Sequence, residues 1–125
     1  MITTAALTLA LTMTNPINIA TCAVDPVVVQ TSGDVTRQEI IGTQIHITFV
    51  NRGSKAISSV AFAVDEDGTT NTILDRGTFS PGIAVSHYWR GDRTLQNVSC
   101  SVNEVLFADG TSWTNQSGPS GIYGL

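Results

Sequence analysis

Charged side chains are scarce in this sequence of 125 residues: Asp, Glu, Lys and Arg make up only 13%, against roughly 25% in ordinary soluble domains. Thr, Ser, Asn and Gly are abundant instead, a composition commoner in extracellular β-proteins than in cytosolic ones. The six basic residues are scattered, and the formal net charge is −4. Because nucleic-acid binding relies on clustered Lys and Arg that displace counterions from phosphate, no nucleic-acid partner is expected.

A long apolar run is also missing. The longest, residues 5–13, is too short and too polar for a transmembrane segment, so none is expected. Two interpretations of residues 1–23 stay open: a signal peptide, interrupted by threonine and without a basic start, or an N-terminal strand of period two. The signal-peptide interpretation implies a secreted or periplasmic protein. Cleavage after Ala20 would keep Cys22 in the mature chain, whereas cleavage after Ala23 would remove it.

Cysteine is limited to Cys22 and Cys100. Two cysteines so far apart lack the paired spacing of a zinc site. Cys100 shares an apolar strand face with Val98 and Val102, and Cys22 lies near the first strand of the mature domain. We therefore expect a Cys22–Cys100 disulfide rather than two free thiols, although acylation of Cys22 in a lipoprotein remains an alternative.

No stretch shows a sustained helical period, and what the sequence has instead is period-two alternation between turn signals. The turn signals lie at residues 51–55, 67–68, 80–82 and 109–110, and we expect bulges near Gly42 and at Asn103-Glu104. About seven short strands in residues 24–114 predict an all-β domain of two packed antiparallel sheets, followed by a flexible tail at residues 115–125. Eight residues are expected between the sheets: Ile45, Ile47, Phe49, Val60, Phe62, Val64, Val102 and Phe107.

Residues 49–65, followed by Gly68 and by a Pro-Gly turn at Pro81 and Gly82, resemble the FxLYD-type immunoglobulin-like domains of small secreted bacterial proteins. In those domains, a strand ending in an Asn-x-Gly turn precedes the strand that carries the F-x-L-Y-D motif. Residues 62–65 match that motif in part and lack its tyrosine. The resemblance covers roughly residues 45–89, and implies an immunoglobulin-like antiparallel β-sandwich with no catalytic residue to carry over.

Catalytic and metal-binding patterns are sparse. No G-x-S-x-G nucleophile elbow occurs, and an EF-hand loop starting at Asp65 would place Thr70 where glycine is required. His46 and His87, the two histidines, lie in predicted strands; His46 is expected to face outward, and His87 to share a face with Trp89. We therefore expect no enzyme, no metal and no cofactor.

Tyr88 and Trp113 are the candidate binding residues, because exposed aromatic rings suit protein or carbohydrate partners. Tyr88 and Trp89 must point to opposite faces of one strand, so one of them belongs to the core. The leading interpretation is a non-catalytic secreted or periplasmic binding module. A structural accessory domain of a cell-surface or envelope assembly is the alternative. A hydrolase ranks third, and would require a cleft that brings His46 or His87 to a carboxylate and a serine.

Overall fold

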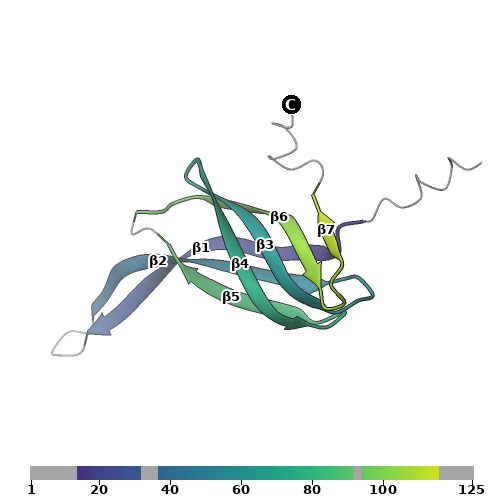
Figure 1. Cartoon of the computed structure of the whole chain (residues 1–125). Coiled ribbons are helices and arrows are strands. Elements are labelled where there is room, and N and C mark those ends of the chain that lie inside the picture. The colour runs from purple at the N-terminus through teal and green to yellow at the C-terminus, as the bar shows by residue number, and fades with distance from the viewer. Residues whose placement is uncertain (1–13, 32–36, 92–93, 116–125) are drawn as a thin grey trace, which may run out of the picture.

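The computed structural model in Figure 1 describes residues 14–31, 37–91 and 94–115, which form seven strands in two antiparallel sheets. The first sheet has the order β1 (Ile17–Thr31), β2 (Arg37–Asn51), β5 (Ala84–Arg90). The second has the order β4 (Thr69–Phe79), β3 (Ile57–Glu66), β6 (Val98–Phe107), β7 (Ser112–Thr114). The predicted all-β sandwich is confirmed. In the described ranges we find no helix that qualifies as a membrane span.

The core lies between the two sheets, where the alternating apolar residues meet. Each of the eight predicted core residues is at most 3% exposed, so that prediction is confirmed. Phe49 sits at the centre: its ring lies 5.2 Å from the ring of Phe62 and 5.3 Å from that of Phe79, tilted and edge-on respectively. Such tilted aromatic pairs add roughly 0.5–1.5 kcal/mol to the burial of their surface.

Both predicted bulges are present. Val27 pairs with Gly42 and Val28 with Ile40, so that Ile41 is the extra residue of β2. In β6 the extra residue is Asn103, since the adjacent residues Ala61 and Phe62 of β3 pair with Glu104 and Val102. After a single extra residue, the side chains that follow point to the opposite face from the one that simple alternation predicts. This explains why Val102 and Val105 are both buried, although one has an even and the other an odd residue number.

The turn signals end the strands as predicted. Asp67 and Gly68 both have positive φ (51° and 95°), which gives the β3–β4 hairpin the twist of a type I′ turn. Pro81 and Gly82 (φ 82°) form a type II turn closed by the Ile83 N–H, which donates to the Ser80 carbonyl at 3.1 Å. Gly110 (φ 93°) turns the chain between β6 and β7.

β1 begins at Ile17, seven residues before the predicted start of the sandwich at residue 24. Ile17 is 2% exposed, and the Arg52 N–H donates to the Pro16 carbonyl at 2.8 Å, so this part of the chain is built into the fold. Residues 17–23 thus belong to the first strand of the sandwich. Cleavage after Ala20 or Ala23 would remove Ile17 from the core. Residues 1–13 and 116–125, which include most of both predicted terminal segments, lie outside the described residues.

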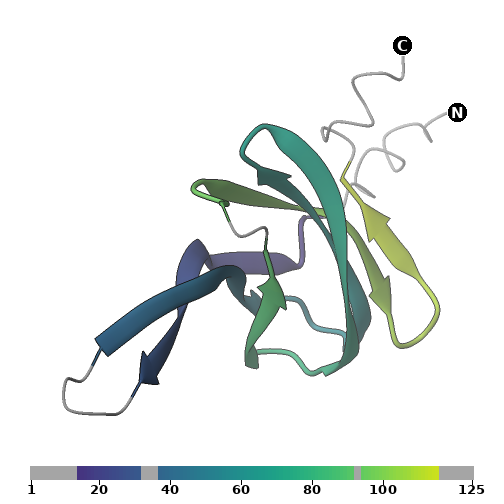
Figure 2. The same ribbon diagram turned by 90° about the vertical axis from the view of Figure 1, so that its left-hand side faces the viewer.

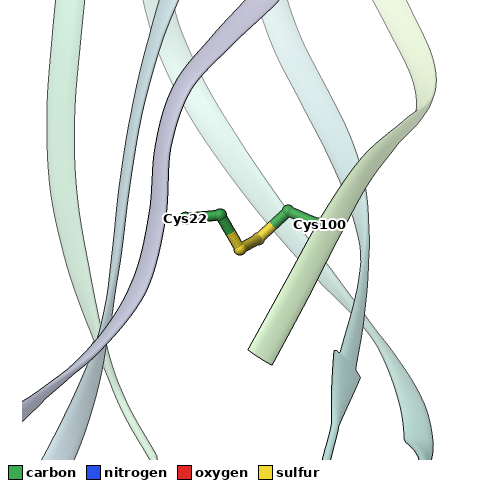
Figure 3. The surroundings of a disulfide bond; sticks show 2 residues. All are labelled: Cys22 and Cys100. Carbon is green, nitrogen blue, oxygen red and sulfur yellow. A yellow bond between two sulfur atoms is a disulfide. The ribbon is translucent and has the colours of Figure 1, made fainter. Parts of the chain in front are cut away.

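A disulfide joins Cys22 of β1 to Cys100 of β6, as predicted. Figure 3 shows the bond crossing from one strand to the other, with the two cysteines facing each other between the sheets. The Cα atoms lie 6.0 Å apart and the cysteines are separated by 78 positions in the chain. The bond therefore closes a loop that contains most of both sheets.

Asp109 in the β6–β7 turn is expected to stay ionised in acid. The Thr111 hydroxyl donates to its carboxylate at 2.5 Å, the Thr111 N–H donates at 2.9 Å, and Lys55 Nζ lies 3.2 Å away. These contacts lower the pKa of Asp109 from 3.8 to about 2. Because the folded pKa is the lower one, this contribution to stability is present above pH 3.8 and is lost as the pH falls through about 2.

An NMR titration of the Asp109 carboxyl group is expected to give a midpoint near pH 2. Thr111→Ala should move the midpoint upward, because the hydroxyl is the strongest of the stabilising contacts. A wild-type midpoint near 3.8 would contradict the hydrogen-bonded turn.

Candidate functional site

Five polar or aromatic side chains gather on the outer face of the three-stranded sheet, and we call them the His46 cluster: Asp25, His46, Thr48, Ser86 and Tyr88. The register brings them together, because β2 pairs His46 with Tyr88 and Thr48 with Ser86. β1 pairs Ala23 with His46, so Asp25, two residues further along β1, shares this face. Directly paired strand residues lie on the same face, and this face is opposite to the one that buries Ile45, Ile47 and Phe49.

The His46 imidazole is contacted on three sides. Its Nε2 lies 2.7 Å from the Ser86 hydroxyl and 3.2 Å from the Thr48 hydroxyl. Its Nδ1 lies 3.6 Å from a carboxylate oxygen of Asp25. The Tyr88 ring stacks on the imidazole with 4.2 Å between centroids and 11° between planes. Stacking and polar contacts together restrict the rotation of the imidazole.

The contacts of His46 follow the order of a nucleophile, a base and an orienting carboxylate: Ser86, His46 and Asp25. The chain contains no nucleophile elbow, and the three residues come instead from three different strands, β1, β2 and β5. Their only signals in the sequence were a histidine with a threonine at i+2 and a serine with a tyrosine at i+2. These signals acquire meaning only when the register of β2 against β5 is known.

A shallow hollow of about 220 Å³ lies next to the His46 cluster. Of the cluster, only Tyr88 lines it, together with Val27, Thr43, Gln44, Trp89 and Arg90. The hollow therefore extends from the exposed Tyr88 side chain to the base of the β1–β2 hairpin. It does not enclose the Ser86 hydroxyl.

The two predicted binding residues lie on different sheets. Tyr88 in β5 is 53% exposed, whereas Trp89 packs against the core, so the two do face opposite sides as predicted. Trp113 in β7 pairs with Val105, is half-buried and also packs against the core. Tyr88 and Trp113 thus do not form one aromatic patch.

His87 faces away from His46, so the two histidines do not share a site. Its Nδ1 lies 2.6 Å from the carboxylate of Asp75, which is 5% exposed and belongs to β4. This pair links β5 to β4 across the edge of the sandwich. A buried carboxylate needs a partner of this kind, so His87 has a structural role.

The acidic turn after β3 uses its carboxylates on the backbone. Asp65 accepts a hydrogen bond from the Gly68 N–H at 2.7 Å, and Asp67 accepts from the N–H groups of Gln96 and Asn97. Asp67 thereby fixes the loop before β6 to the β3–β4 turn. Both carboxylates thus bind backbone N–H groups, as acidic residues in turns commonly do.

The distal part of the β1–β2 hairpin, residues 27–31 and 37–43, projects beyond the sandwich, as Figures 1 and 2 show, and we call it the arm. β5 pairs only with residues 44–50 of β2, so the arm has two strands. It carries four exposed aliphatic residues, which are 39–63% exposed: Val28, Val29, Ile40 and Ile41. Alternation in sequence predicted strands here but not their exposure, because it does not show where the second sheet ends.

Comparisons of the chain with protein-family models, with curated proteins and with solved structures give no match. The resemblance to FxLYD-type domains therefore stays a prediction. The functional interpretation depends on the outer face of the three-stranded sheet, the arm and the His46 cluster.

Proposed function

We propose that this protein is a non-catalytic binding module that holds a protein partner on its three-stranded sheet. The observation that carries the proposal is the distribution of exposed apolar side chains. Among the described residues eight large hydrophobic side chains are exposed, and five of them belong to β1, β2 or β5: Val28, Val29, Ile40, Ile41 and Tyr88. Exposed apolar surface that gathers in one part of a protein, here mainly the arm, marks interaction sites in soluble proteins.

The arm favours a partner that covers more than one of its faces. Val28 pairs with Ile40, so these two side chains share one face, while the adjacent residue Val29 points to the other. A two-stranded hairpin is only marginally stable in water on its own. A partner that packs on both faces would bury aliphatic surface at about 25 cal/mol per Å² and would stabilise the hairpin.

A protein fits this surface better than a carbohydrate. Sugar-binding faces combine aromatic platforms with polar groups, and Trp113 is half-buried on the other sheet, which leaves Tyr88 as the exposed aromatic residue of this face. The arm offers aliphatic side chains, which suit the apolar centre of a protein interface. The carbohydrate alternative predicts binding that depends on Tyr88 and is indifferent to the arm.

The location we propose is extracellular or periplasmic, with residues of the N-terminal run acting in export. The disulfide supports it, because such bonds persist in oxidising compartments. The low charge and the partial FxLYD resemblance also favour an extracellular or periplasmic location. The resemblance further favours an immunoglobulin-like arrangement of the strands. A purely structural accessory domain would suit a uniformly polar surface, and the apolar arm argues against it.

Charge substitutions in the arm test the proposal. The wild-type protein, a Val28→Asp/Ile40→Asp variant and a control variant Leu74→Asp/Leu106→Asp would each be immobilised and exposed to the envelope and secreted proteins of the producing cells. The control residues are similarly exposed, at 45% and 42%, and lie on the other sheet. We expect the amount of partner protein held by the immobilised arm variant to be at least tenfold lower than for wild type, and that held by the control variant to change little. Both variants should have melting temperatures close to that of the wild type.

Equal loss of binding in the two variants would contradict an interface on the arm. Loss only on Tyr88→Ala, together with binding to a glycan array, would instead support the carbohydrate alternative.

A further inference from the structure

We propose that Ser86 is an activated nucleophile, the site at which this protein accepts an acyl or phosphonyl group from an electrophilic ester. The inference is independent of the partner proposed above, because it rests on the His46 cluster alone. It concerns a single covalent modification and requires no enclosed substrate pocket.

The base is correctly placed for this reaction. His46 Nε2 lies 2.7 Å from the Ser86 Oγ, within the range over which a base removes a hydroxyl proton. Asp25, 3.6 Å from Nδ1, favours a proton on that nitrogen, which leaves Nε2 free to accept the Ser86 proton. Asp25 is thus a positioning residue, and the stacked Tyr88 ring holds the imidazole in this orientation.

The direction of the Ser86 backbone N–H follows from the register of the β2–β5 ladder. Two pairs flank the β2–β5 ladder: Ile83 accepts from the Asn51 N–H, and the Gly91 N–H donates to Thr43. Because hydrogen-bonded pairs recur at every second residue of an antiparallel ladder, odd-numbered residues of β5 direct their backbone groups toward β2. The Ser86 N–H therefore points to the other edge of β5, which pairs with no strand among the described residues.

The Thr48 hydroxyl, 3.2 Å from the Ser86 Oγ on the same outer face, is placed to donate to the oxyanion. The Ser86 N–H leaves the free edge of β5 in the plane of the sheet, away from β2, so it is not directed at this face. The outer face thus combines a base, an orienting carboxylate and one oxyanion donor.

The step balances without any further reactant. The Ser86 Oγ forms a bond to the carbonyl carbon or phosphorus of the ester, and its proton passes to His46 Nε2. The bond from that carbon or phosphorus to the leaving group breaks, and His46 returns the proton to the departing alkoxide or fluoride. The products are an ester on Ser86 and a free alcohol, or hydrogen fluoride when the reagent is a fluorophosphonate.

Because the neighbouring hollow is lined by Tyr88 and not by Ser86, we expect the rate to rise linearly with reagent concentration and not to saturate. This behaviour separates a reactive acceptor residue from an enzyme with a bound substrate complex. It also keeps the proposal compatible with a binding module that does not turn over a substrate.

The test uses the purified, disulfide-bonded protein with a fluorophosphonate and with p-nitrophenyl acetate, followed by intact mass and peptide mapping. We expect one adduct, located on Ser86, and none on a Ser86→Ala variant. His46→Gln should slow labelling by about 100-fold, the lower end of what a general base contributes. Asp25→Asn should slow it less, with recovery in Asp25→Glu, as a positioning role requires.

Ser101→Ala is the matched control, because Ser101 is an exposed strand serine on the other sheet, and labelling should be unchanged. Mapping of the wild-type protein needs no variant to fold, so it decides the question by itself. Adducts spread over several hydroxyl groups or located on Tyr88, or labelling as fast in His46→Gln as in wild type, would overturn the proposal. Failure here would leave the arm interface untouched, because the two tests change different residues.

Discussion

Replacement of both Cys22 and Cys100 by serine is expected to lower the free energy of unfolding by about 3–5 kcal/mol. The bond joins β1 to β6 and thereby ties one sheet to the other across the core. It closes a loop of 78 positions, and in the chain-entropy model the loss of unfolded-state freedom grows with loop length. Without the bond, the two sheets are held together by core packing, by the His87–Asp75 pair and by the hydrogen bond from Asn51 to the Phe79 carbonyl.

Chemical denaturation of the wild type and of the Cys22→Ser/Cys100→Ser variant measures this difference. Wild-type protein reduced and alkylated before unfolding should behave like the variant, which separates loss of the bond from loss of the side chains. Intact mass with and without reduction establishes the starting state. A difference below about 1 kcal/mol, or two free thiols in freshly exported protein, would show that the bond is not a structural element.

Asn51→Leu is expected to destabilise the fold by about 3–5 kcal/mol. Asn51 is 0% exposed at the end of β2, and its side-chain amide donates to the carbonyls of Lys55 (2.8 Å) and Phe79 (2.9 Å). Its amide oxygen accepts from the Gly53 N–H at 2.9 Å. Leucine has a similar volume but leaves these three backbone groups without the side chain that binds them, and each such loss costs about 1–3 kcal/mol.

The effect reaches two loops. Asn51 binds the turn after β2 and the end of β4, and its carbonyl accepts from the Gly82 N–H in the turn that follows β4. Asn71→Leu is the matched control: Asn71 is exposed and its amide donates to Glu66, so its loss should cost less than about 0.5 kcal/mol. Urea denaturation of both variants gives the comparison. Similar stabilities for the two would show that Asn51 is not the connection between these turns.

Sequence patterns predicted the parts of the fold that depend on neighbours along the chain. Alternation placed Ile47 and Phe62 in the core, and Gly68 and Gly110 marked turns that need positive φ. The role of Asn51 was not visible, because an Asn-x-Gly sequence predicts a turn without showing that its amide is buried and joined to β4.

The His46 cluster and the arm depend on contacts between distant segments. Ser86 reaches His46 only because β5 pairs with β2 in one register, and a shift of one residue would point Ser86 into the core. Ile40 is exposed because β5 and the second sheet end before the arm does. Hydrophobicity along the chain shows neither the strand register nor the point at which the second sheet ends, so the exposure of Ile40 could not be predicted.

If a partner occupies the three-stranded sheet, cross-links made in the producing cells should form from residues of that sheet. A photo-reactive amino acid would replace Ile40 or Tyr88 on this sheet, or Leu74 or Leu106 on the other; all four residues are 42–63% exposed. We expect positions 40 and 88 to give a cross-linked adduct with a partner of one discrete mass, and positions 74 and 106 to give none. Adducts from positions 74 and 106 alone, or none from any of the four, would contradict a partner on the three-stranded sheet.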